Sequence, residues 1–231
     1  MNHAPNDARV RLGFLICFAV KEEAAFAWPL RAKDGRDLLI TGMGRRNTSE
    51  QFRQALVRLN PDRVLTCGFA GALNPDFKIG DVLFDEDYDA GLGEKLRALG
   101  VKPATFYCST RVAVTVAEKA ELRRTTGADA VEMESSVIRT LCREHNIPSA
   151  TIRVISDTAN EDLPLDFNAL MTSNQKISLA KLAFALIKSP QKVPRLMHLQ
   201  TNTRLAAQRL ADVLKGLLDG IGGSGSSLVC R

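Results

Sequence analysis

The amino-acid sequence predicts an α/β fold, because strand-like and helix-like segments alternate along a chain of 231 residues. Residues 130–159 show the pattern most clearly, as a short strand, an amphipathic helix and a β-branched strand. We expect this unit to close as a right-handed crossover between parallel strands, with the helix start and the end of the second strand at one sheet edge. With 45% hydrophobic and 25% charged residues, the chain is long enough to bury one core.

The remaining elements follow in order along the chain. Strands are expected over residues 12–19 and 38–41, and Asn-Thr-Ser-Glu at 47–50 has the form of a capping box that starts a helix ending at Asn60 and Pro61. Two more strands, over 63–67 and 81–84, are expected on either side of a glycine-rich turn. A longer strand over 107–114 then leads to a helix over 117–126.

The C-terminal part of the sequence is helical in pattern. Apolar residues recur at helical spacing over 179–186, Pro190 follows, and a second amphipathic run covers 193–218. Glycine and serine dominate the end of the chain. We therefore expect a single domain over residues 1–219 and a disordered tail over 220–231.

Composition limits the setting and the kinds of site. No apolar run approaches the roughly 20 residues of a membrane span, and residues 1–12 lack the apolar stretch of a signal peptide, so a cytoplasmic protein is expected. The five cysteines are scattered without a CxxC pair, which indicates reduced thiols. The three histidines are far apart and have no ligand spacing, so we expect no metal.

Several ordered motifs carry a family resemblance. They are VEME at 131–134, IP at 147–148, IRVISDTA at 152–159, CGFAGAL at 67–73, KIGDVL at 78–83 and FAVKEEA at 18–24. Over roughly residues 12–187 the sequence resembles the purine nucleoside phosphorylase and nucleosidase superfamily, in particular the methylthioadenosine/S-adenosylhomocysteine nucleosidases and the hopanoid-associated phosphorylases. The resemblance implies a three-layer αβα fold with a mixed central sheet, a homo-oligomer, and cleavage of the N-ribosidic bond of a purine nucleoside without a cofactor.

The resemblance assigns Asp157 to the purine ring, as the acid that assists departure of the base. For that role the pKa of Asp157 must rise, and we expect burial among apolar neighbours such as Val154 and Ile155 to raise it. The alternative is a helix cap, since Ser-Asp-Thr is also good N-cap chemistry. The matching motif around Glu134 favours the catalytic interpretation.

Glu134 is expected to bind the ribose, because one carboxylate accepts hydrogen bonds from two adjacent hydroxyls. Met133 would provide apolar surface under the sugar, and Glu132 belongs to the same substrate-binding motif. The alternative interpretation makes both glutamates a favourable first helical turn and Met133 a core residue. Both interpretations are compatible.

The nucleophile is the less decided part of the prediction. The resemblance places Glu23 at the attacking water, although Glu22 is adjacent and a solvated helix start is the alternative. Phosphate is the other candidate nucleophile, and would make the protein a phosphorylase with phosphate as co-substrate. Backbone N–H groups near Gly44 with Arg45 and Arg46 could then hold that anion. A turn shaped by glycine with solvated arginines is the alternative.

The segment Phe69, Ala70, Gly71 is expected to line the substrate pocket. It departs from the nucleosidases, because Phe69 replaces a small or hydroxylated residue. This variant resembles the hopanoid-associated phosphorylases, which suggests an adenosyl lipid as an alternative substrate. Residues 85–106 are also short compared with familiar members. A non-catalytic nucleoside-binding protein is therefore a further alternative.

The formal charge of +5 is concentrated late in the chain. Basic amphipathic helices bind anionic membranes in some proteins, so peripheral membrane contact through the C-terminal helix stays an alternative to a solvated helix face. No aromatic residue lies within residues 188–215, which carry these charges, so we expect no nucleic-acid partner.

Overall fold

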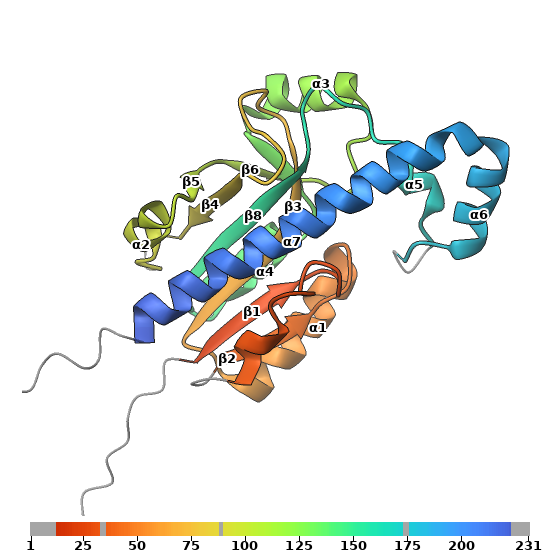
Figure 1. The fold of residues 1–231 in the computed structure, drawn as a ribbon. Helices are drawn as coiled ribbons and strands as arrows, with labels where there is room; N and C mark the ends of the chain where they lie inside the picture. The colour runs from red at the N-terminus through yellow and green to blue at the C-terminus, as the bar shows by residue number, and fades with distance from the viewer. Residues whose placement is uncertain (1–12, 33–35, 88–89, 173–175, 223–231) are drawn as a thin grey trace, which may run out of the picture.

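The computed structural model describes residues 13–32, 36–87, 90–172 and 176–222 (Figure 1). Its strands are β1 (Phe14–Phe18), β2 (Arg36–Ile40), β3 (Arg63–Ala72), β4 (Val82–Glu86), β5 (Lys102–Pro103), β6 (Phe106–Cys108), β7 (Ala130–Glu132) and β8 (Ser149–Asp157). Its helices are α1 (Arg45–Leu59), α2 (Gly93–Ala98), α3 (Val116–Thr126), α4 (Ser135–Glu144), α5 (Phe167–Leu170), α6 (Leu179–Lys188) and α7 (Val193–Gly222), with 3-10 turns η1 (Trp28–Ala32) and η2 (Pro190–Lys192).

The strands form one mixed sheet, as predicted. Its main path is β2-β1-β3-β8-β4-β5, and β7 joins β3 to β6 at the side of this path. Strands β2, β1, β3 and β8 are parallel, whereas β4 runs antiparallel to β8 and β7 runs antiparallel to β3. All nine residues of β8 are buried, as expected of a central strand.

Helices cover both faces of the sheet, which confirms the three-layer α/β architecture. Side chains alternate along β1: Phe14, Ile16 and Phe18 pack with α7, while Leu15 and Cys17 pack with α1 and α4. Figure 1 shows α7 crossing one face, with α1 and α4 on the other. The two apolar faces of the sheet thus each bury the stripe of an amphipathic helix.

The segment 130–159 does contain a strand, a helix and a strand, but their expected parallel crossover is wrong. Strand β7 pairs antiparallel with β3, and β3 pairs parallel with β8, so β7 and β8 run in opposite directions on either side of β3. Glu134 and Asp157 come close for another reason. Asp157 ends β8 and Glu134 follows β7, and both strands flank the carboxyl-terminal end of β3.

The glycine-rich segment is part of a strand rather than a turn. Strand β3 continues to Ala72, with Gly68 opposite Arg153 and Phe69 opposite Val154 in β8. A register shift between Ala70 and Gly71 marks a bulge there. The expected strand over 107–114 is also wrong beyond Cys108, because the Asn168 side chain instead pairs with both the N–H and the carbonyl of Val112.

The ends of the helices test the predicted boundaries. As predicted, α1 ends at Asn60, and this residue has the left-handed conformation with φ of 40°. The predicted capping box is wrong, since α1 already begins at Arg45 after Gly44, whose φ is 80°. The box in the structure lies at α3, where Thr115 and Glu118 cap each other's backbone.

The C-terminal helices are confirmed and extend further than predicted. Helix α7 continues to Gly222, so residues 220–222 of the expected tail are helical, and the rest of that tail lies outside the described residues. Four of the five cysteines are described, and all four are free. Within the described residues, no helix is both long and apolar enough to span a membrane.

Candidate active site

A cavity of about 250 Å³ lies at the carboxyl-terminal ends of β1, β3 and β8. Parallel sheets usually bind ligands at this edge. Its lining brings together most of the predicted site: Glu23, Phe69, Ala70, Gly71, Glu132, Met133, Glu134 and Asp157. The loop after β6 adds Arg111, Val112 and Ala113, which the sequence prediction missed because it placed them in a strand.

Glu23 is a buried carboxylate held by backbone donors. Its Oε2 accepts hydrogen bonds from the N–H groups of Ala19 at 2.9 Å and Val20 at 3.2 Å, and its Oε1 accepts one from Phe69 N–H at 2.9 Å. Burial raises the pKa of Glu23, although the Arg153 guanidinium and these donors oppose the shift. A buried carboxylate with a raised pKa is suited to accept a proton near neutral pH.

Gly68 leaves the space that Glu23 occupies. A Cβ added at Gly68 would lie 2.5 Å from Oε1 of Glu23. Gly71 has the same relation to the other carboxylate, since its Cβ would lie 3.0 Å from Oδ2 of Asp157. The two glycines of β3 therefore allow two acidic side chains to approach the strand.

Asp157 is the last residue of β8, and both of its carboxylate oxygens accept hydrogen bonds. Oδ1 accepts one from the Ser156 hydroxyl at 2.8 Å, and Oδ2 accepts one from the Lys119 ammonium at 2.6 Å. Asp157 is buried, as expected, and polar groups contact it as well as apolar ones. The alternative of a helix cap is wrong, because the next helix is α5 and its capping residue is Asp166.

Lys119 is the clearest functional candidate that the sequence prediction missed. Its side chain is 0% exposed, and its ammonium also donates to the carbonyls of Thr158 at 2.6 Å and Glu161 at 3.0 Å. In the sequence, Lys119 looks like one of several solvated charges on α3. The signal that could have found it is its place on the helix, three residues after the first helical residue and one turn from the capping box.

Glu134 precedes α4, and its carboxylate reaches the start of another helix. Its Oε1 accepts a hydrogen bond from Gly44 N–H at 2.9 Å. Burial and the nearby Glu23 carboxylate raise the pKa of Glu134 to about 7, while the Gly44 N–H opposes the shift. Met133, beside it in the chain, also lines the cavity.

Glu132 is turned into the protein, where Arg153 pairs with it. Its Oε2 accepts hydrogen bonds from the Arg153 guanidinium at 2.7 Å and from the backbone of Glu134 and Ser135, while Oε1 accepts one from the Ser135 hydroxyl. Burial alone would raise the pKa of Glu132, but the Arg153 charge and these donors hold it below the ordinary value. This arrangement fixes the backbone that carries Glu134.

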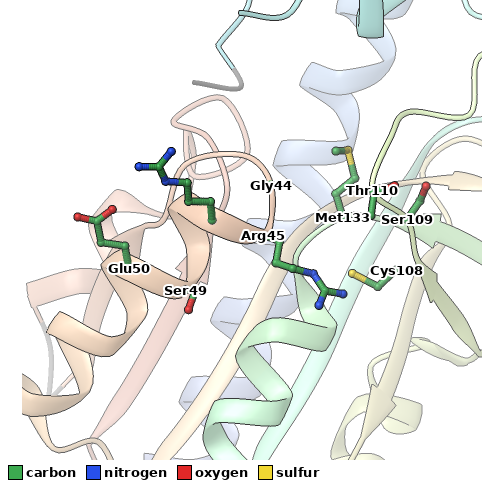
Figure 2. Close-up of a pocket in the computed structure, with 9 residues that line it drawn as sticks. Gly44, Arg45, Ser49, Glu50, Cys108, Ser109, Thr110 and Met133 are labelled. Carbon is green, nitrogen blue, oxygen red and sulfur yellow. The ribbon is translucent and has the colours of Figure 1, made fainter. Parts of the chain in front are cut away.

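A second cavity, of about 520 Å³, adjoins the first at Met133. Figure 2 shows Arg45 reaching from the start of α1 toward Cys108 across it. Gly44, Arg45 and Arg46 all line this second cavity, so the structure brings the predicted anion-binding residues together beside the carboxylates. The Gly44 N–H, however, already donates to Glu134.

Among the described residues, no group of three or more His, Cys, Asp or Glu side chains is arranged to hold a metal ion.

Comparison with known proteins shows what the chain is similar to. A family model described as the phosphorylase superfamily matches residues 84–188. This match agrees with the family resemblance in the motifs of the chain. The 5′-methylthioadenosine/S-adenosylhomocysteine nucleosidase of Staphylococcus aureus is 25% identical, over 59% of this chain and 75% of that protein.

Solved structures share the fold. The 5′-methylthioadenosine/S-adenosylhomocysteine nucleosidase of Neisseria meningitidis matches with a TM-score of 0.68 and 17% identity, covering 90% of this chain and 99% of that one. The Helicobacter pylori enzyme of the same name, in complex with a pyrrolidine ligand, gives 0.66 and 17%, covering 91% and 99%. The futalosine hydrolase of the same species also gives 0.66 and 17%, covering 91% and 98%.

Proposed function

We propose that the protein is a nucleosidase that cleaves the N-ribosidic bond of an adenine-type nucleoside with water. The observation that carries this proposal is the meeting of Glu23, Glu134 and Asp157 around one cavity at the end of the parallel strands. The relatives named as nucleosidases and hydrolases support a nucleosidase-type enzyme in general. Residue roles, base and nucleophile belong to the proposal.

The reaction breaks the bond between C1′ of the ribose and N9 of the purine, and the bonding electron pair leaves with the base. Asp157 gives or shares a proton at N7, so that the base departs without a full negative charge. Positive charge develops on the ribose ring at the same time. The carboxylates of Glu134 and Glu23, which both line the cavity, stabilise that charge.

Water completes the reaction. Glu23 accepts a proton from the water molecule as its oxygen forms a bond to C1′, which yields free ribose and base. Glu134 accepts hydrogen bonds from the 2′ and 3′ hydroxyls and fixes the sugar during this attack. Met133 and Phe69 provide the apolar surface around the bound nucleoside. No cofactor takes part.

Lys119 acts as a positioning residue for Asp157. Its ammonium fixes Oδ2 from the side of α3 while the Ser156 hydroxyl fixes Oδ1. It also ties the backbone after β8 in place through Thr158 and Glu161. As a charged donor on the carboxylate, Lys119 is placed to return a proton to Asp157 after the base has left.

Measurement of base release tests the proposal. Methylthioadenosine, adenosine and inosine are incubated with the protein in the presence and absence of phosphate, and free base is quantified. We expect adenine release without phosphate, and we expect Asp157→Asn to reduce it by about 10²-fold to 10⁴-fold with the fold intact, because an amide delivers no proton. Full activity of Asp157→Asn would overturn the assignment, and release from none of the substrates would favour a nucleoside-binding protein.

A phosphorylase is the second candidate function. The second cavity favours it, because Arg45 and Arg46 line it and neither forms an ion pair with the residues that the structure describes. Two guanidinium groups beside a ribose site suit an inorganic phosphate. If base release strictly requires phosphate, and Arg45→Gln loses this release, the protein is a phosphorylase and not a hydrolase.

A further inference from the structure

The charge distribution of the C-terminal region is strongly one-sided. No Asp or Glu occurs between Asp166 and Asp212. The same stretch carries seven cations: Lys176, Lys181, Lys188, Lys192, Arg195, Arg204 and Arg209. Residues 167–211 therefore carry more positive charge than the formal charge of +5 for the whole chain.

Helix α6 combines this charge with exposed apolar side chains. Every residue of α6, all within the described part of the chain, is at least partly exposed. Leu179 is 78% exposed, Phe184 59% and Ile187 79%. Met197, in the first turns of α7, is 62% exposed. We call residues 179–197 the basic apolar hairpin.

The hairpin lies at one end of the molecule. In Figure 1, α6 and the first turns of α7 extend beyond the strands of the sheet. The rest of α7 is different, because its apolar residues Leu210, Leu214 and Leu217 are buried against the sheet. The amphipathic surface expected from the whole C-terminal run is therefore reduced to the hairpin.

Exposed apolar side chains at this density indicate a binding surface. The four cations of the hairpin, Lys181, Lys188, Lys192 and Arg195, lie among them. Lys188 shows how they can coexist, since its ammonium lies 4.6 Å from the centre of the Phe184 ring and its stem covers apolar surface. A second copy of this chain on the same face would bring like charges together, whereas an anionic surface would neutralise them.

We propose that the basic apolar hairpin binds the surface of an anionic lipid bilayer. Leu179, Phe184 and Ile187 enter the headgroup region, and Lys188 and Lys192 contact lipid phosphates. The helix lies on the membrane and does not span it. This inference does not depend on the proposed reaction.

The test is sedimentation of the full-length protein with vesicles of phosphatidylcholine alone or mixed with phosphatidylglycerol. We expect binding only to the anionic vesicles, and weaker binding as salt is raised. The double variant Phe184→Ser/Ile187→Ser should lose at least tenfold in affinity. Lys188→Gln/Lys192→Gln should lose about fivefold per removed cation. As a control, Val57→Ser changes an apolar residue of α1 that is 89% exposed, and should bind like wild type.

Equal binding to both kinds of vesicle, or binding to neither, would overturn the proposal. So would unchanged binding of the Phe184→Ser/Ile187→Ser variant. Analytical ultracentrifugation of the same variants tests whether a second copy of the chain binds the hairpin instead. If the wild type does not bind vesicles but self-associates, and the Phe184→Ser/Ile187→Ser variant does not self-associate, the hairpin joins two copies of the chain. Base release in solution should be the same in wild type and variants, so that failure here leaves the proposed reaction untouched.

Discussion

Gly68 and Gly71 show how single residues shape this site. In the sequence they form a glycine-rich segment predicted as a turn, yet they lie in β3 and face Glu23 and Asp157. Because they have no side chain, they leave room for a carboxylate to lie against the strand. A methyl group at either position competes with that carboxylate for the same space.

Gly68→Ala should therefore reduce both activity and stability. The new Cβ would lie 2.5 Å from Oε1 of Glu23, and this buried carboxylate can make room only by leaving its backbone N–H donors. A displacement of about 1 Å typically costs roughly 10²-fold in rate. Steady-state kinetics and urea unfolding measure the two effects. Gly220→Ala is the matched control, because a Cβ there meets nothing within 4 Å.

Lys119→Gln should separate positioning from structure. Adenine needs a proton to depart, whereas 4-nitrophenol leaves as a stable anion. We expect kcat for an adenine nucleoside to fall by about 10²-fold, with kcat for 4-nitrophenyl riboside nearly unchanged. Equal losses on both substrates would assign Lys119 a structural role alone. Lys215→Gln, on the exposed side of α7, serves as the control.

Glu134 predicts a particular dependence on pH. Its pKa is raised to about 7, so it is protonated below that pH and ionised above it. Because the ionised form accepts the ribose hydroxyls, KM should fall as pH rises through about 7, and Glu134→Gln should abolish this change. The stability of the protein without substrate should change in the opposite sense, because it decreases while substrate binding improves. An acid with a raised pKa holds its proton better when folded, so the free energy of unfolding should fall as pH rises from about 4.5 to about 7.

The residue types of the site could be predicted from the sequence because the motifs name them. Asp157, Glu134 and Glu23 all line the predicted kind of cavity. Lys119 could not be predicted, since burial of a lysine depends on how α3 packs on the loop after β8. The separate cavity of Arg45 and Arg46 also depends on packing, in this case of α1 against the loop after β6.

At the scale of elements, β8 carries Asp157 at its end and, through Arg153, also holds the segment with Glu134. Arg153 lies in the middle of this buried strand and pairs with Glu132, at the end of β7. The pair joins strands that do not contact each other directly, because β3 lies between them. The start of α4, and with it Glu134, is thereby held at a fixed place.

Glu132→Gln should destabilise the protein strongly. It leaves the buried Arg153 guanidinium without its charged partner, and breaking such a pair from one side costs about 3–5 kcal/mol. Chemical denaturation measures this change. Glu121→Gln removes the partner of Arg124 in an exposed ion pair of α3, and should unfold like wild type. A loss for Glu132→Gln no larger than for Glu121→Gln would contradict the role of the pair.

Element types were more predictable than element partners. The helices over 117–126 and 179–186 and the buried strand before Asp157 follow from local periodicity. The direction of β7 does not follow from periodicity, because a strand of three residues is too short to show a pattern. Its direction is set by its pairing with β3. The strand expected over 107–114 fails for a similar reason, as Asn168 takes the backbone groups of Val112.

For the molecule as a whole, the mixed sheet covered by helices on both faces was predictable from alternating elements and from the family motifs. The basic apolar hairpin was only partly predictable. Its composition is visible in the sequence, but the sequence cannot tell which apolar side chains of the C-terminal run are buried. The structure separates them: Leu214 is 0% exposed and Ile187 is 79% exposed.

Helix α7 joins the hairpin to the rest of the molecule. Its 30 residues span about 45 Å, with one end in the hairpin and the other against β8 and β3. Close to its first turn, Arg195 donates to the carbonyl of Asp162, in the loop that follows Asp157. A lipid surface that binds the hairpin would thus lie against an element that contacts the loop after Asp157. If both proposals hold, we expect interfacial activation, in which an enzyme turns over at a different rate when adsorbed than when free in solution.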